Sequence, residues 1–156
     1  MDTATQPVST PEAAPRQRSK PLLPVRGVVS LVDRNEAQVL AMIEEGSLLW
    51  AFDVALDPKS GHCRELRVLP AAVAAYLRGE ACSFDWPDVF SLLVTDSPTV
   101  LAREVSHVLN VSSTHVYNLI GRKALVSCSR QKTGPFGSAR IPTDSFAQFL
   151  KNRRFP

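Results

Sequence analysis

The stretch from Ser112 to Asn118 is a run of small and uncharged polar side chains whose chemistry suits contact with DNA bases. The amide of Asn118 can pair with adenine in the major groove, and the hydroxyls of Ser113 and Thr114 can reach base edges or phosphates. The imidazole of His115 can likewise contact base edges or phosphates. Small residues at the start of a helix also permit close approach to the groove. The stretch therefore predicts a helix that reads DNA.

Aromatic and basic residues accompany this run at positions that suit contact with the phosphate backbone. Tyr117 lies within it, and Arg122 and Lys123 follow it directly. A basic segment at 130–132 lies where a hairpin could reach the backbone or the minor groove. The candidate DNA-binding residues are Ser112, Ser113, Thr114, His115, Tyr117, Asn118, Arg122, Lys123, Arg130, Gln131, Lys132 and Arg140.

The charge of the chain is divided unevenly along its length. Residues 99–156 carry nine Lys and Arg against two acids, whereas residues 25–98 carry six against eleven. The formal net charge of +3 thus combines about +7 on the last segment, −5 on the middle and +1 on the first 24 residues. Polar residues on a surface helix are usually only solvated, but this basic context favours DNA as the partner of the last segment.

Apolar periodicity places the polar run on the second helix of a helix–turn–helix, with helices over 102–109 and 113–120. The turn needs a residue of positive φ, and Asn110 is of the type that tolerates it best after glycine. Ser112 or Ser113 can cap the second helix. A strand over 124–129, a hairpin tip over 131–137, a return strand at 140–141 and a final helix over 143–152 are expected to follow.

The order of these parts resembles the winged helix–turn–helix of the phage excisionase and MerR-like regulator group. The resemblance is carried by V-L-A-R-E-V-S-H-V-L-N-V-S-S-T-H-V-Y-N-L-I, and it continues through Ala124–Leu125 and Arg140–Pro142 into the last helix. It covers about the last 58 residues and implies that Tyr117, Arg122 and Lys123 contact phosphates. Two positions depart from the group. Leu101 stands where a Ser or Thr caps the first helix, so we expect Thr99 to supply the cap, and Asn110 replaces the glycine of the turn.

The preceding segment predicts a similar series of elements. A helix over 35–45, a strand over 48–56, a turn at 57–61, a strand over 62–68 and a helix over 71–77 are expected. A short helix from Asp85 to Leu93 follows, and residues 80–98 are interpreted as a connector. Trp86, Phe90 and Leu93 are its expected contact residues.

The two segments also align, which favours an internal duplication. At one constant offset, five residues of the first segment align with five of the second: Val39, Leu40, Met42, Ile43 and Leu48 with Val116, Tyr117, Leu119, Ile120 and Leu125. After the hairpin the offset is shorter by four, and four more residues align: Arg67, Val68, Tyr76 and Leu77 with Arg140, Ile141, Phe149 and Leu150. A longer hairpin in the first copy accounts for that change, because insertions collect at loop tips. Chance similarity between amphipathic helices is the alternative.

The first copy is not expected to read DNA. Its helix presents Asn35, Glu36, Gln38, Ala41, Glu44 and Glu45, and carboxylates at groove distance would be repelled by phosphates. Trp50 and Phe52 on the following strand suit a dimer interface or a protein partner, or else they fill a small core. Residues 25–79 are therefore interpreted as a degenerate winged module.

Other classes of function find no support in the composition. No Gly-rich phosphate loop or nucleophile–base arrangement is present, so no catalytic residue, enzyme activity or cofactor is expected. Three widely spaced cysteines and three scattered histidines predict no metal site and a reduced cytoplasmic protein. No stretch is apolar enough to predict a membrane partner.

The sequence therefore predicts an α+β protein of tandem winged helix–turn–helix modules with a disordered N-terminal tail. The expected units are a tail over 1–24, a degenerate module over 25–79, a connector over 80–98 and a DNA-binding module over 99–156. The expected function is sequence-specific binding of double-stranded DNA at the nucleoid, as a transcriptional regulator or an excisionase-like architectural factor, by a homodimer or cooperative oligomer. The alternative is a protein-interaction adaptor or accessory subunit, with a protein partner bound through residues 25–79.

Overall fold

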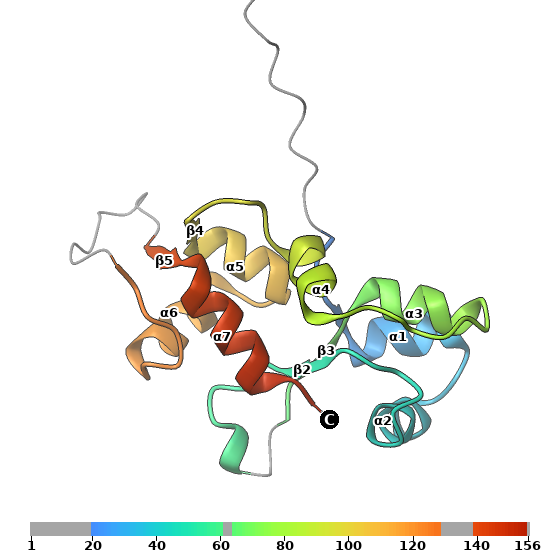
Figure 1. Ribbon diagram of the computed structural model, residues 1–156. Coiled ribbons are helices and arrows are strands. Elements are labelled where there is room, and N and C mark those ends of the chain that lie inside the picture. The colour runs from blue at the N-terminus through green and yellow to red at the C-terminus, as the bar shows by residue number, and fades with distance from the viewer. Residues whose placement is uncertain (1–19, 61–63, 129–138, 156) are drawn as a thin grey trace, which may run out of the picture.

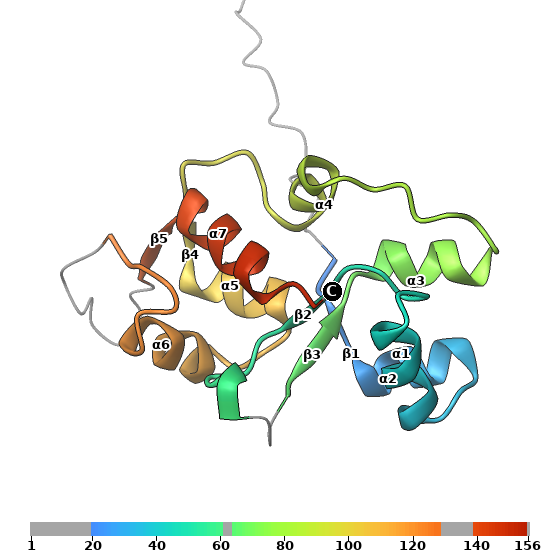
Figure 2. The same ribbon diagram turned by 60° about the horizontal axis from the view of Figure 1, so that its bottom comes forward.

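The computed structural model describes residues 20–60, 64–128 and 139–155, and these form a mixed α+β protein with two small antiparallel sheets. Residues 20–79, called here the first half, and residues 99–155, called the second half, lie at opposite ends of the molecule (Figures 1 and 2). Helix α4 (Trp86–Leu93) lies between them. The predicted α+β class is therefore confirmed.

The first half contains β1 (Leu23–Pro24), α1 (Val25–Val32), α2 (Glu36–Glu44), β2 (Ala51–Asp53), a 3-10 turn (Pro58–Ser60), β3 (Leu66–Val68) and α3 (Pro70–Leu77). Its strands pair in the order β1-β3-β2. Asn35 caps α2 by accepting the backbone N–H of Gln38, whose side chain accepts the N–H of Asn35 in return. Val28, Val39, Ile43 and Val73 are buried together beneath the three helices.

The second half contains β4 (Thr99–Leu101), α5 (Ala102–Leu109), α6 (Ser113–Gly121), β5 (Arg140–Pro142) and α7 (Thr143–Arg153). Strands β4 and β5 are antiparallel neighbours. The N–H of Leu101, just before α5, is bound by the carboxylate of Glu104 at 2.7 Å. Thr99 lies in β4 opposite Pro142, so the expectation that Thr99 caps α5 is wrong.

Backbone geometry repeats between the two halves at the offsets that the sequence alignment gave. The pair Leu23↔Val68 in the first sheet corresponds to Val100↔Ile141 in the second. The residue that ends the first helix is left-handed in both halves, with φ 52° at Asp33 and φ 53° at Asn110. Left-handed backbone recurs after the second helix, at Gly46 and Lys123. Such positions are rare for non-glycine residues, so their coincidence supports a true repeat over chance similarity.

Most predicted helices are confirmed, but α1 was missed. The helices expected at 35–45, 71–77, 85–93, 102–109, 113–120 and 143–152 all form with small shifts of their ends. Helix α1 is rich in valine and contains Gly27, and both residue types have low helix propensity. The repeat could have revealed it, because Val28 and Val32 correspond to Val105 and Leu109.

The strand predictions were less accurate. The strand expected over 48–56 is limited to β2, since Trp50 is left-handed and Asp53 bends the chain by accepting the N–H groups of Ala55 and Glu65. No strand forms over the described part of 124–129. There the N–H groups of Ala124 and Leu125 bind the carbonyl of Leu119, at the end of α6, instead of a neighbouring strand.

Ordered structure begins before Val25, so the predicted end of the tail at residue 24 is wrong. Leu22 is completely buried, and its N–H binds the carbonyl of Val108 at 2.8 Å. The predicted disorder of residues 1–19 falls outside the described residues.

A single apolar cluster joins the two halves through α4. Trp50 and Phe52 of the first half are buried, and their rings lie 5.9 Å and 6.4 Å from Trp86 of α4. Phe146, Phe149 and Leu150 of α7 belong to the same cluster, as does Leu93 of α4. Trp50 and Phe52 therefore fill the core, which was the alternative to their forming a dimer or partner interface. The connector contacts this cluster through Trp86, Phe90 and Leu93, as the sequence predicted.

Polar contacts reinforce this junction. The N–H of Phe155 binds the carbonyl of Ala51 at 2.8 Å, and the guanidinium of Arg153 binds the carbonyl of Ala55 at 2.8 Å. The guanidinium of Arg154 stacks over the ring of Trp50 at 3.9 Å from its centroid. Burial lowers the pKa of Arg153, and the nearby carboxylates of Asp53 and Asp57 oppose that shift.

None of the helices in the described part of the chain combines the length and apolar character that a bilayer-spanning segment requires.

We expect the protein to unfold in one cooperative step, because the two halves share a core. Phe52→Ala should lower the free energy of unfolding by about 3–5 kcal/mol, whereas Leu92→Ala, at an exposed position of α4, should change it by less than about 0.5 kcal/mol. Both tryptophans lie at the junction, so their fluorescence reports the junction while circular dichroism reports the helices. Separate denaturant midpoints for the two signals would contradict a shared core.

Candidate nucleic-acid interface

The turn between α5 and α6 is held by hydrogen bonds that reach into the first half. Asn110 is left-handed, as the sequence predicts, with φ 53° and ψ 52°. Its side-chain amide donates to the carbonyl of Leu22 at 3.1 Å, and its own carbonyl accepts from the guanidinium of Arg67 at 3.2 Å. The hydroxyl of Ser106 donates to the carbonyl of Val111 at 2.7 Å. The direction in which α6 leaves the turn is therefore fixed from both halves.

Helix α6 buries one face and exposes the other. Val116 and Leu119 are completely buried against the shared cluster. Ser112 caps the helix by accepting the N–H of His115 at 3.1 Å, which decides between the two caps that the sequence allowed. The candidate residues Ser112, Ser113, Thr114 and Asn118 are all exposed, so a ligand can reach them.

His115 is the one candidate on α6 that the structure places differently. Its Nε2 lies 2.7 Å from the carbonyl oxygen of Val54, and its Nδ1 lies 3.9 Å from a carboxylate oxygen of Glu65. Only 16% of its side chain is exposed. His115 thus binds α6 to the β2–β3 hairpin of the first half, and the prediction that it lies on the exposed face of α6 is wrong. Its partner lies 61 residues away in the chain, beyond the reach of local sequence patterns.

Tyr117 connects α6 to the segment that leads into β5. Its hydroxyl oxygen accepts the N–H of Ala139 at 3.2 Å, and its ring is partly exposed. Ala139 in turn accepts the N–H of Ala102 at 2.8 Å, and the exposed Arg140 follows it. Tyr117 therefore positions the chain next to α6 as well as presenting a ring to solvent. Arg130, Gln131 and Lys132, the remaining candidates, lie outside the described residues.

Positive charge adjoins the exposed end of α6. Arg122 and Lys123 follow the helix directly, and both are exposed. Glu65 is an acid beside α6, and its carboxylate lies 2.6 Å from the guanidinium of Arg67. That pairing offsets its negative charge, so it does little to repel a polyanion from the helix. The arrangement can place uncharged hydrogen-bonding groups in a groove while cations approach the strands.

The equivalent surface of the first half has a different character. Helix α2 exposes Glu36, Glu44 and Glu45, and Asn35 and Gln38 are occupied with capping its first turn. Glu44 lies 3.5 Å from the guanidinium of Arg64, a surface pair that neutralises only part of this charge. The carboxylates predicted on this helix are thus exposed, and they disfavour contact with phosphates.

No group of three or more His, Cys, Asp and Glu side chains suited to a metal ion occurs among the residues described. Comparison of the chain with protein-family models, with curated proteins and with solved structures found no match. The assignment of a function therefore depends on the exposed face of α6 and on the residues that hold this helix in place.

Three residues that position α6 were not singled out as site residues from the sequence. Leu22, Val54 and Arg67 all belong to the first half and bind the turn or His115 across the junction. The repeat gave one signal, since Arg67 aligns with the candidate Arg140. The other two contacts use backbone carbonyls, which carry no sequence signature.

We expect the left-handed turn position Asn110 to tolerate glycine better than alanine. Asn110→Ala should destabilise the protein by about 2–3 kcal/mol, because alanine pays about 1–2 kcal/mol in the left-handed region and the bond to Leu22 is worth about 1 kcal/mol. Asn110→Gly keeps the backbone geometry and loses only the hydrogen bond, so it should cost less. Urea denaturation of both variants measures the difference. A glycine variant as unstable as the alanine variant would contradict the backbone explanation.

Proposed function

We propose that this protein binds double-stranded DNA in a sequence-specific manner through the second half, with α6 in the major groove. The observation that carries the proposal is the exposed, uncharged polar face of Ser113, Thr114 and Asn118, which is followed at once by the exposed cations Arg122 and Lys123. An α-helix fits the major groove, where an Asn amide can bind adenine bidentately. The flanking cations are placed to contact phosphates and fix the register.

Under this proposal each half is a winged helix–turn–helix module, and only the second reads DNA. The repeated strand register and the repeated left-handed positions support two modules of common design. The acidic surface of α2 supports a different task for the first. Arg140, which is exposed in β5, would lie near the backbone or minor groove, while the predicted contacts Arg130, Gln131 and Lys132 fall outside the described residues.

A single short recognition helix gives weak specific binding, so cooperative binding by several copies is part of the proposal. Both a transcriptional regulator and an excisionase-like architectural factor act in this way, and either would work at the nucleoid.

The proposal predicts that Asn118→Ala weakens specific binding and leaves non-specific binding nearly unchanged. Loss of one base contact costs about 1–3 kcal/mol, or roughly 5- to 150-fold in affinity for the preferred site. The preferred site is first obtained by selection from random DNA with the purified chain. Fluorescence anisotropy then compares the two proteins on that site and on a scrambled duplex. Equal losses on both duplexes would contradict a base contact by Asn118.

Arg122→Ala should weaken binding to both duplexes and lower the slope of log affinity against log salt by about one unit, as expected for one lost phosphate contact. Arg26→Ala removes the same charge from α1, which packs on α2 and α3 rather than on α6, and serves as the matched control. Equal effects of the two variants would show that only net charge matters. Absence of salt-dependent binding in the parent chain would instead favour the adaptor or accessory role.

A further inference from the structure

One side of α6, called here the reading face, is exposed along its whole length and carries no charged side chain. It consists of Ser113, Thr114, Tyr117, Asn118 and Gly121. These residues share one side because an α-helix has about 3.6 residues per turn. Thr114 and Gly121 lie along the middle of the face, with Tyr117 and Asn118 on either side of them. The absence of charge limits which bases this face can recognise.

Thr114 and Asn118 carry hydrogen-bonding groups that the rest of the described chain does not use. Both side chains are exposed, and neither forms a hydrogen bond to another described residue. Ser112 and His115 differ in this respect, since Ser112 caps the helix and His115 is bound to Val54. The hydroxyl of Thr114 and the amide of Asn118 are therefore available to a ligand.

The repeat shows that the fold does not require these two groups. The corresponding positions of α2 are Ala37 and Ala41, at the offset by which Val39 aligns with Val116. Alanine has a higher helix propensity than threonine or asparagine, so both exchanges weaken the helix itself. A ligand that contacts the two side chains accounts for their presence.

The chemistry of these side chains favours A·T base pairs. In the major groove an asparagine amide pairs bidentately with N6 and N7 of adenine, and a threonine methyl contacts the methyl of thymine. The corresponding contacts to G·C pairs are made by Arg or Lys with guanine and by Asp or Glu with cytosine. The reading face contains none of these four residue types.

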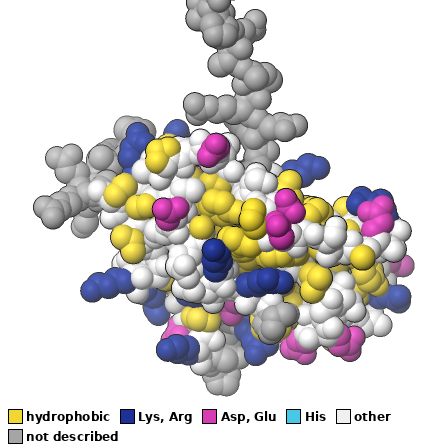
Figure 3. Space-filling model, viewed as in Figure 1, with side chains coloured by type: hydrophobic (Ala, Val, Ile, Leu, Met, Phe, Trp, Pro, Cys, Tyr) yellow, Lys and Arg dark blue, Asp and Glu magenta, His cyan; other side chains and the backbone are white. Residues whose placement is uncertain are grey.

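The cations next to α6 lie beyond the reading face. Arg122 is the C-terminal cap of the helix, and Lys123 is left-handed with φ 60°, so the chain leaves the helix axis at this point. Cations at the end of a recognition helix suit contact with phosphates, which fix the register but carry no sequence information. On the face shown in Figure 3, Lys and Arg side chains are spread among uncharged and apolar groups.

Gly121 leaves the reading face open near the end of the helix. A Cβ at this position would meet no described atom within 4 Å, and the backbone is not left-handed. Neither packing nor backbone conformation in the described chain therefore requires glycine here, although glycine weakens a helix. Its counterpart in α2 is the exposed Glu44. The missing side chain permits close approach of the groove to the helix.

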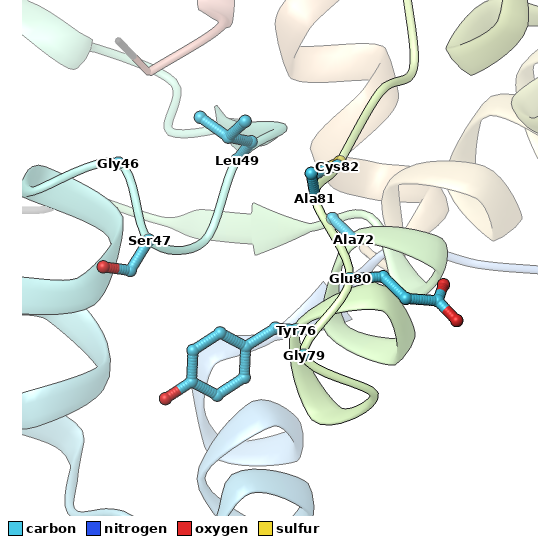
Figure 4. A pocket seen from close by; sticks show the side chains of 9 residues that line it. All are labelled: Gly46, Ser47, Leu49, Ala72, Tyr76, Gly79, Glu80, Ala81 and Cys82. Atoms are coloured by element: carbon cyan, nitrogen blue, oxygen red, sulfur yellow. The ribbon is translucent and has the colours of Figure 1, made fainter.

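The pocket of the first half has no comparable set of converging polar groups. It is open, has a volume of about 360 Å³ and lies between α3 and the loop at 46–49 (Figure 4). The carboxylate of Glu80 and the hydroxyls of Ser47 and Tyr76 point outward rather than toward one another. The reading face is thus the better candidate for specific recognition.

We propose that α6 reads A·T base pairs, with the amide of Asn118 on an adenine and the methyl of Thr114 on a thymine. The two residues lie one turn apart, about 6 Å along the helix axis, which matches roughly two steps of about 3.4 Å between stacked base pairs. The preferred site therefore contains two A·T pairs at this spacing. This inference rests on the proposed binding of double-stranded DNA and adds which bases are recognised.

Selection of bound duplexes from random DNA with the full chain gives the first test. The selected sites should share two A·T pairs at the expected spacing. Replacement of either pair by G·C should weaken binding roughly 5- to 150-fold, measured by fluorescence anisotropy.

Base analogues then identify the atoms in contact. Adenine without N7, as in 7-deazaadenine, should weaken binding of the parent chain and leave Asn118→Ala unaffected. Uracil in place of thymine removes one methyl, which should weaken binding of the parent about fourfold and leave Thr114→Ser unaffected. Each variant should keep its sensitivity to the other analogue, so the two variants are matched controls. Circular dichroism checks that both are folded.

Asn118→Arg should change the preference instead of only weakening it. Arginine pairs bidentately with O6 and N7 of guanine, so selection with this variant should return G·C in place of A·T at one position of the site. The second A·T position should be retained.

The possible failures distinguish this inference from the proposal of DNA binding. Selected sites with G·C at both positions would overturn the inference and leave sequence-specific binding in place. A preference for A·T that ignores both analogues would also overturn it, because the shape of the groove rather than the base edges would then be read. A chain without any sequence preference would contradict the proposed function itself, and the inference with it.

Discussion

The packing of α7 of the second half against β2 of the first is the constraint on which the rest of the molecule depends. Residues 50–55 are buried on both faces, which a half of this size could not achieve alone. The same contact orients α6, because the turn at Asn110 is bound by Leu22 and Arg67, and His115 is bound by Val54. A surface that must enter a groove is thus held by residues far from it in the chain.

The two halves keep a common backbone and differ in what they expose. The left-handed residue after the first helix is Asp33 in one half and Asn110 in the other, and both types tolerate that conformation through their short polar side chains. The helix that follows is acidic in the first half and uncharged in the second. Since backbone geometry depends on a few turn and core positions, the surface charge is free to diverge without loss of the fold.

Local signals in the sequence were enough for most helices and for the exposure of Ser113, Thr114 and Asn118. Apolar spacing, capping residues and the tolerance of Asn110 for positive φ are properties of short segments. The errors concern features set by distant residues: β2 is shortened by the left-handed Trp50 and by Asp53, and His115 is drawn to the first half. Helix α1 was missed because valine-rich segments with glycine have weak helical preference, so tertiary packing rather than propensity decides their structure.

The charges of α2 bear on how the first half would lie relative to DNA. Residues 20–79 carry seven Lys and Arg against seven acids, so the first half as a whole has no net charge. Its helix α2 nevertheless exposes Glu36, Glu44 and Glu45, and a helix that faced DNA with these carboxylates would oppose binding, because phosphates repel them. If the second half reads DNA as proposed, the duplex would therefore lie along α6 and away from the exposed face of α2.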